Sequence, residues 1–164
     1  MLCYLYKKSG FVSDIYGGYY SWTAAMNAQN SSDLNPSGVQ GACPAGWHIP
    51  SDSEWKQLET WLGMSQVELN STSFRGTDQG AKLKDVCSGR FGFNMGVTNA
   101  SGFSALPGGE RDNQGFSGVG YYANFWTSTQ GNGGIIRQLN LENNAVTRDG
   151  MQLSWGLSIR CVKD

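Results

Sequence analysis

The 164-residue chain has few charged residues: Lys, Arg, Asp and Glu make up 15% of it, where about 25% is usual for a soluble domain. The net charge is −1 and no basic stripe runs through the sequence. Nucleic-acid binding is therefore not expected, because it needs a dense cationic surface that neutralises phosphates. No apolar run is long enough to cross a bilayer as a helix, so direct membrane insertion is not expected either.

Residue types that carry catalysis or bind metals are also scarce. His48 is the only histidine, which excludes the multi-histidine clusters of catalytic zinc sites. No GxSxG-type context offers a nucleophile to it, so a buried, structural histidine is expected. Glu110 and Asp112 could form a hydrolase pair or a calcium site, but their spacing is not that of a calcium-binding loop. We predict no catalytic residue, no metal and no cofactor.

Cysteines are few and far apart: Cys3, Cys43, Cys87 and Cys161 form no CxxC motif. Their spacing does not make a zinc site. An even number of cysteines at long separation permits disulfides, which form in oxidising compartments. Buried free thiols are the alternative.

Glycine and aromatic residues are abundant instead, with 23 Gly, six Trp, seven Tyr and seven Phe. The length is sufficient for one domain with a full hydrophobic core, and no linker divides residues 1–164. The composition predicts a domain rich in loops and turns that is anchored by large aromatic side chains. We expect Trp22, Trp55, Trp61 and Trp126 in the core, and Trp155 to be the most exposed tryptophan.

The strongest local pattern predicts a helix that begins after Ser51. Ser51 and Glu54 have the spacing of a capping box, and Pro50 disfavours helix before them. Gly63 is placed to end the helix in a left-handed conformation. One apolar stripe along this helix is formed by Trp55, Leu58, Trp61 and Leu62.

A second helix is predicted over Ser21–Gln29, with Ser21 as its N-cap and Trp22, Ala25 and Met26 on one face. Shorter helical turns are expected within Met64–Asn70 and Gln79–Val86. The first twenty residues are interpreted as early strands or an extended lead-in. Their apolar runs are Cys3–Tyr6 and Phe11–Tyr20.

The C-terminal half is strand-like. Asn143 and Asn144 suit a hairpin turn that requires positive φ. Early helices followed by an antiparallel sheet predict an α+β fold. The expected strands are Ser101–Pro107, Asn124–Thr129, Ile135–Leu141, Ala145–Arg148 and Leu157–Val162.

Six motifs resemble the Fibrobacter succinogenes major paralogous domain in order and spacing: YGGYYSWTAAMN, CPAGWHIPSDSEWKQLETWLG, GAKLK, SGFSALPGGERD, NFWTST and GLSIRCVKD. The resemblance extends from about Tyr16 to the end of the chain. That family in turn resembles the C-type-lectin-like fold in its formylglycine-generating-enzyme branch. This implies an α+β domain with two main helices, a small twisted antiparallel sheet and long irregular loops. It also implies secreted or surface-anchored bacterial proteins, often lipoproteins.

The chain departs from that enzyme branch in its cysteines. The enzyme uses a pair of reactive cysteines near its C-terminus, whereas only Cys161 lies in the last third here. We therefore do not expect this chain to have the activity of that enzyme. The calcium-dependent sugar-binding motifs of true C-type lectins are absent as well. The resemblance implies a disulfide between Cys43 and Cys161, and more weakly one between Cys3 and Cys87.

Residues 121–155 resemble the variable regions of retroelement-diversified proteins that share this fold. The resemblance implies a rigid scaffold that presents exchangeable, outward-facing side chains. The expected ligand-binding positions are Tyr121, Tyr122, Asn124, Ile135, Ile136, Arg137, Asn143, Asn144, Arg148, Asp149 and Trp155. An ordinary family member without diversification is the alternative.

Together these patterns predict a recognition module, outside the cytoplasm, for an unidentified protein or glycan. We expect the domain to be a monomer or a weak oligomer. Two other function classes stay open. One is an active enzyme of the formylglycine-generating type, and the other is a structural tip domain of a surface assembly.

Overall fold

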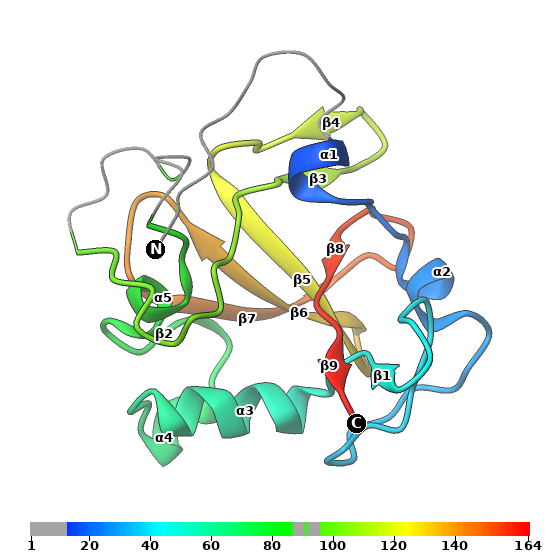
Figure 1. Ribbon diagram of the computed structural model, residues 1–164, viewed down its shortest axis with the longest axis horizontal. Coiled ribbons are helices and arrows are strands. Elements are labelled where there is room, and N and C mark those ends of the chain that lie inside the picture. Colours follow the sequence, from blue (N-terminus) through cyan, green and yellow to red (C-terminus); the bar gives the residue numbers. More distant parts are fainter. Residues whose placement is uncertain (1–12, 87–90, 92–95) are drawn as a thin grey trace.

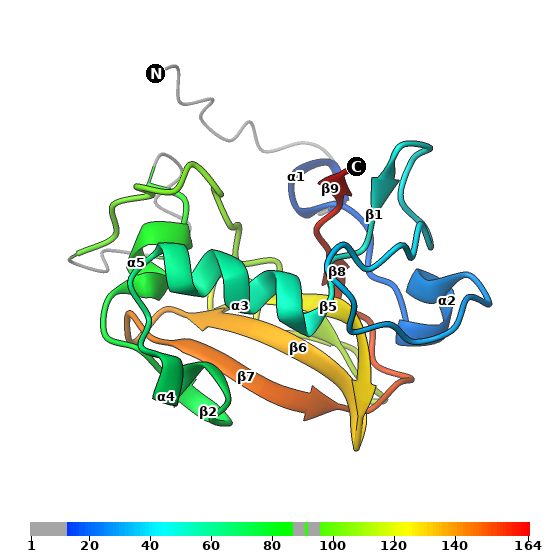
Figure 2. The same cartoon turned by 90° about the horizontal axis from the view of Figure 1, so that it is seen from below.

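The computed structural model describes residues 13–86, 91 and 96–164 (Figure 1). The fold is α+β, as predicted: a five-stranded sheet carries helix α3 across one face (Figure 2). Among the described residues only α3 is longer than five residues, so the expected second main helix is a short one. The helices are α1 (Ser13–Tyr16), α2 (Trp22–Met26), α3 (Asp52–Trp61), α4 (Gln66–Leu69) and α5 (Gln79–Leu83).

Helix α3 begins as the sequence predicts. The Ser51 hydroxyl accepts a hydrogen bond from Glu54 N, and the Glu54 carboxylate accepts one from Ser51 N, which completes the capping box. Gly63 follows the helix with φ of 96°, a conformation that costs glycine little. Both signals are local in the chain, which is why sequence alone places this helix correctly.

The apolar stripe of α3 is narrower than predicted. Trp55 and Leu62 are buried, but the Trp61 side chain is 71% exposed, so its expected place in the core is wrong. At 3.6 residues per turn, Trp61 lies roughly 120° around the helix from Trp55. The buried face is completed on its other side by Asp52 and Glu59, which turns Trp61 toward solvent.

Helix α2 is shorter than predicted. Ser21 caps it, and Trp22, Ala25 and Met26 are buried as expected. The helix ends at Met26 because Asn27 and Ala28 have left-handed φ of 47° and 61°, so it does not reach Gln29.

The main sheet has the strand order β2-β7-β6-β5-β8. Its central strands β5 (Tyr122–Gly131), β6 (Gly133–Asn140) and β7 (Val146–Met151) are antiparallel neighbours, and β2 (Ser73–Arg75) continues them beside β7. Strand β8 (Ser158–Ile159) pairs parallel to β5. The sheet is therefore mixed, not purely antiparallel.

The closing segment is two strands where one was predicted. Only Ser158 and Ile159 pair with β5, and β9 (Val162–Lys163) pairs instead with β1 (Trp47–His48). The predicted disulfide between Cys43 and Cys161 is present and lies next to β9. The other suggested pairing, Cys3 with Cys87, lies outside the described residues.

The backbone geometry shows that two predictions are wrong, one of a strand and one of a hairpin turn. Ser101–Pro107 is not a strand, because Ser104 has a left-handed φ of 54° and only Ala105 forms a bridge, to Lys84. Asn143 and Asn144 do not have positive φ. The connection between β6 and β7 is longer than a two-residue turn, and the Asn140 side chain accepts hydrogen bonds from the backbone N–H groups of Glu142 and Asn143.

The N-terminal and central loops contain structure that was not predicted. Ser13–Tyr16 forms α1 and Tyr20 forms a single bridge to Leu157, so residues 13–20 are not a strand; Phe11 and Val12 lie outside the described residues. The segment Cys3–Tyr6 lies outside the described residues. The glycine-rich loop folds into a hairpin of β3 (Glu110–Arg111) and β4 (Phe116–Ser117).

Two apolar clusters form the core. One lies between α3 and the sheet and includes Trp55, Phe125 and Leu139. The other lies around α2 and includes Trp22 and Trp126. Trp126 and Trp22 are thus buried as predicted. Trp155 packs against the second cluster and is less exposed than Trp61 and Trp47, so the expectation that it is the most exposed tryptophan is wrong.

Candidate binding site

The predicted binding positions do not form one surface. Asn124, Ile136 and Arg137 are buried, so the expectation that they face outward is wrong. Asn124 donates from Nδ2 to the carboxylate of Glu110 at 2.9 Å, and Ile136 packs in the cluster around Trp126. These three residues support the scaffold and are inaccessible to a ligand.

Arg137 belongs to a buried ionic network between α3 and the sheet. Its Nη1 donates to Asp52 Oδ1 and its Nε to Glu59 Oε1, both at 2.7 Å. Arg75 of β2 donates to Glu59 Oε1 at 2.7 Å, and Arg148 of β7 donates to both oxygens of Asp52 at 2.8 Å. Arg148 is therefore held by α3 and is not a free surface residue.

The electrostatics of this network keep Asp52 ionised. Burial alone would raise the pKa of the Asp52 carboxyl, but hydrogen bonds from Arg148, Lys56 and Arg137, together with the charge of Arg137, lower that pKa well below its usual range. The network fastens α3 to β2, β6 and β7.

Asn143 and Asn144 are half-buried in the β6–β7 connection, and both of their backbone carbonyls accept hydrogen bonds. Asn143 Oδ1 accepts from Ala145 N, and the Asn143 carbonyl accepts from the Lys84 ammonium at 2.5 Å. The Asn144 carbonyl accepts from Gly80 N. Ile135 and Trp155 are half-buried, and Asp149 is exposed.

Tyr121 and Tyr122 are the predicted positions that join a larger surface. Their rings lie 5.8 Å apart, next to the hairpin of β3 and β4. The ring of Phe116, which is 67% exposed, meets that of Tyr19 edge-on at 5.3 Å. We call this surface the aromatic face; its members are Tyr16, Tyr19, Phe116, Val119, Tyr121 and Tyr122.

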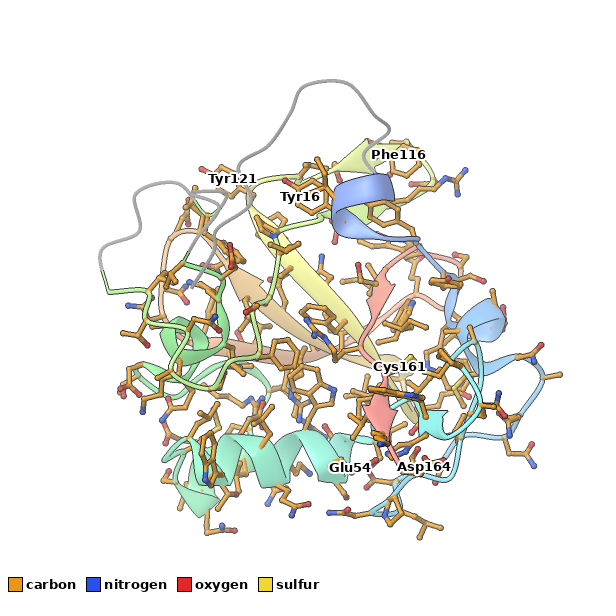
Figure 3. All side chains as sticks on the ribbon, viewed as in Figure 1. Tyr16, Glu54, Phe116, Tyr121, Cys161 and Asp164 are labelled. Carbon is orange, nitrogen blue, oxygen red and sulfur yellow. A yellow bond between two sulfur atoms is a disulfide. The ribbon has the colours of Figure 1, made fainter. Side chains whose placement is uncertain are left out.

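The backbone draws these aromatic residues together. Gly118 O accepts from Tyr121 N and Tyr122 N, which folds the end of β4 back onto the start of β5. A side chain at Gly118 would meet the Tyr122 ring at 2.5 Å, and its φ is 68°, so only glycine fits there. The Tyr19 hydroxyl donates to Gly108 O. Figure 3 shows Tyr16, Phe116 and Tyr121 along the same edge of the molecule.

Sequence reasoning missed Phe116, Tyr16 and Tyr19 as surface residues. Phe116 stands alone among Gly, Ser and Asn, a context that signals a loop but not its partner. Tyr16 and Tyr19 lie about a hundred residues before it, and long-range bridges of Tyr20 to Leu157 and of Arg111 to Gly156 help to bring the two regions together.

A groove lies between α3 and the closing segment. Two of its lining residues, Glu54 and Cys161, lie away from Phe116 and Tyr121, toward the opposite end of the molecule (Figure 3). The volume of the groove is about 540 Å³, and its walls are mainly apolar. We call it the α3 groove; it is lined by Pro50, Glu54, Trp55, Gln57, Leu58, Trp61, Phe103, Arg160, Cys161 and Val162.

His48 lies beside this groove and is buried, as predicted. Its Nε2 is 2.7 Å from Glu54 Oε1 and its Nδ1 is 2.6 Å from Asp164 Oδ1. Burial alone would lower the pKa of His48, but the hydrogen bonds and charges of Glu54 and Asp164 raise it. The histidine joins α3 to the end of β9.

Asp112, which the sequence suggested as part of a hydrolase pair or calcium site, has a structural role in a turn. Asp112 Oδ1 accepts from the backbone N–H groups of Gln114 and Gly115 in the turn of the hairpin. Within residues 13–86, 91 and 96–164 no three His, Cys, Asp or Glu side chains come together as a metal site. In the same part of the chain no helix is long and apolar enough to span a membrane.

Comparison with known proteins identifies a family for this chain. The family model of the Fibrobacter succinogenes major domain matches residues 3–163, which is nearly the whole chain. No curated protein and no solved structure matches it. The chain therefore belongs to the Fibrobacter succinogenes major domain family.

Proposed function

We propose that this chain is a ligand-recognition module that works outside the cytoplasm and binds a partner protein with the aromatic face. The observation that carries the proposal is the grouping of six large apolar side chains around one hairpin, with Phe116 67% exposed. Exposed aromatic side chains provide large contact area at low entropic cost.

The surroundings of the aromatic face favour a protein as the partner. The hairpin region surrounds its aromatic residues with Gly, Ser, Asn, Gln and Arg, a mixture typical of antibody binding loops. Arg111, Asn113 and Gln114 are exposed beside Phe116. An apolar centre with a polar rim is the usual anatomy of a protein interface.

The disulfide supports a location outside the cytoplasm. Cys43 and Cys161 are joined across 118 positions of sequence, and such bonds persist in oxidising compartments. The same bond supports binding over formylglycine-generating chemistry, because it occupies the Cys161 thiol.

We further propose that the fold is C-type-lectin-like and that its C-terminal region is diversified by a retroelement. Burial, together with the ion pair between Arg148 and Asp52, divides the eleven expected positions into two groups with different tolerance to exchange. Four support the scaffold: Asn124, Ile136, Arg137 and Arg148. Seven are at least partly exposed: Tyr121, Tyr122, Ile135, Asn143, Asn144, Asp149 and Trp155.

Sequencing of near-identical gene copies tests diversification. We expect substitutions at the seven exposed positions and none at the four scaffold positions. Substitutions spread equally over both groups, or absent from both, would contradict diversification and leave the recognition function to be tested by itself.

A displayed peptide library of random sequence tests the recognition function. The immobilised domain should enrich peptides that lose at least about tenfold in affinity for the double variant Phe116→Ala, Tyr121→Ala, because each removed side chain is a central aromatic contact. The control variant is Val67→Ala, whose side chain is 84% exposed on α4, away from the hairpin. Enriched peptides that bind the double variant as well as the wild type would refute the proposal, as would a failure to enrich any.

A further inference from the structure

The α3 groove contains a cation whose partner is missing from the described part of the chain. Arg160 Nη2 donates to the carbonyl of Phe103 at 3.0 Å, and its guanidinium carbon lies 4.3 Å from the centre of the Phe103 ring. The remaining guanidinium N–H groups make no hydrogen bond within the described residues and are not buried. Burial lowers the pKa of Arg160.

The other arginines packed against the core have different surroundings. Arg75 pairs with Glu59, Arg137 pairs with Glu59 and Asp52, and Arg148 pairs with Asp52. Within residues 13–86, 91 and 96–164 no carboxylate forms an ion pair with Arg160. A cation partly removed from water is normally paired, so the difference is informative.

The one acidic side chain in the groove is already engaged. Glu54 Oε1 contacts His48 Nε2, and Glu54 Oε2 accepts from the backbone N–H groups of Ser51 and Ser37 at 2.9 and 3.0 Å. Glu54 is therefore committed to the cap of α3 and to His48. Arg160 is left as the charged group in the groove that can meet a ligand.

The apolar walls define the rest of the ligand. Trp61, 71% exposed, and Leu58 form the α3 wall, and Phe103 and Val162 lie among the residues of the opposite side. A volume of about 540 Å³ lies within the usual range for small-molecule sites, which combine apolar walls with a few polar groups.

We propose that the α3 groove binds a small amphiphilic carboxylate. Its carboxylate pairs with the free N–H groups of Arg160, and its aromatic or aliphatic part lies against Trp61 and Leu58. Arginine is suited to this role because its planar guanidinium donates two parallel hydrogen bonds to one carboxylate. The site lies at the end of the molecule opposite the aromatic face and does not depend on the function proposed for that face.

A matched pair of probes tests the charge requirement. 1-Naphthaleneacetate and its neutral primary amide have the same ring system and differ in the group that meets Arg160. In calorimetric titration of the wild-type chain at neutral pH, we expect the acid to bind at least about tenfold more tightly than the amide, because hydrogen bonds to charged groups are the stronger ones. Equal affinities, or no binding of the acid, would overturn the proposal.

Variants locate the binding in the groove. Arg160→Gln should reduce the affinity for the acid to that for the amide, and Arg160→Lys should restore part of the difference. Trp61→Ala should weaken acid and amide alike, because it removes the apolar wall and leaves the charge. This exposed position also keeps the test valid if Arg160→Gln fails to fold.

Phe74→Ala is the matched control, since it removes an exposed aromatic ring on β2 that belongs neither to the α3 groove nor to the aromatic face. It should leave both affinities unchanged. A wild-type affinity for the acid in Trp61→Ala, or a loss in Phe74→Ala equal to that in Trp61→Ala, would place binding elsewhere and refute the assignment.

Discussion

The interface between α3 and the sheet and the aromatic face around the β3–β4 hairpin distribute their side chains in opposite ways. At the interface, Asp52, Glu59 and Arg137 are buried in contact with one another. On the hairpin, Phe116 and Tyr121 are exposed. The first region therefore buries charged side chains, and the second exposes aromatic ones.

The comparison shows that residue type does not decide burial by itself in this chain. A buried charge is tolerated when its partners compensate for the lost water, and each carboxylate of the network meets at least one guanidinium at 2.7 or 2.8 Å. A single exposed aromatic side chain is common on protein surfaces and needs no special explanation. A group of exposed aromatic side chains is typical of an interaction surface. The first region therefore concerns stability, and the second is the surface that we propose for recognition.

Removal of the central charge from the interior should have the largest effect. Arg137→Met leaves Asp52 and Glu59 with fewer cations in a buried setting, and loss of one partner from a buried pair typically destabilises by about 3–5 kcal/mol. We expect the free energy of unfolding, measured by urea titration, to fall by about that amount.

Asp149→Asn is the matched control, because it changes a charge on β7 that is exposed. It should alter the free energy of unfolding by no more than about 0.5 kcal/mol. A loss below about 1 kcal/mol in Arg137→Met would mean that the network is compensated by water and does not fasten α3 to the sheet.

A smaller, pH-dependent effect is expected from His48. Its pKa is raised above the ordinary value of 6.5 by Glu54 and Asp164, against the opposing effect of burial. A raised pKa in the folded state stabilises fully below the unfolded pKa, and this contribution is lost as the pH rises through the folded pKa. Asp164 is 61% exposed, so solvent screens its share.

Urea unfolding of the wild type at several pH values from about 6 to about 9 should show this loss. The His48→Gln variant should lack this loss of stability with rising pH, while its free energy of unfolding at any single pH can differ for other reasons. The comparison therefore uses the pH dependence and not the absolute stability. Identical pH dependence in the two proteins would contradict a protonated His48 in the folded chain.

Local signals explain what the sequence predicted well. The capping box of Ser51 and Glu54 and the left-handed Gly63 depend on neighbours in the chain, and both are present. The disulfide between Cys43 and Cys161 was implied by family resemblance. It was not accessible from residue patterns, because four cysteines at long separation permit several pairings.

Side-chain burial was harder to predict because it depends on packing between distant segments. Trp55 and Trp61 lie on the same helix, yet only Trp55 faces the sheet, since the interface includes the polar Asp52 and Glu59. Arg137 looks like an exposed strand residue until α3 is placed over β6.

The candidate sites were predicted only in part, because they too depend on packing between distant segments. Tyr121 and Tyr122 stayed on the surface, but their neighbour Phe116 depends on an unforeseen hairpin. Arg160 lies between the half-buried Ile159 and Cys161. Only the three-dimensional structure shows that no carboxylate of the described residues pairs with it.

The smallest effect is expected from Phe116→Ala. Its ring is 67% exposed and touches Tyr19 edge-on, and such a ring contact contributes about 0.5–1.5 kcal/mol even when well formed. We expect the free energy of unfolding to fall by less than about 1 kcal/mol in urea titration. Phe125→Ala, which removes a buried ring from the cluster with Trp55, should cost about 3–5 kcal/mol. A loss in Phe116→Ala that approached the loss in Phe125→Ala would show that the hairpin ring supports the fold. In that case its exposure would not be evidence for recognition, and the contrast between the two regions would fail.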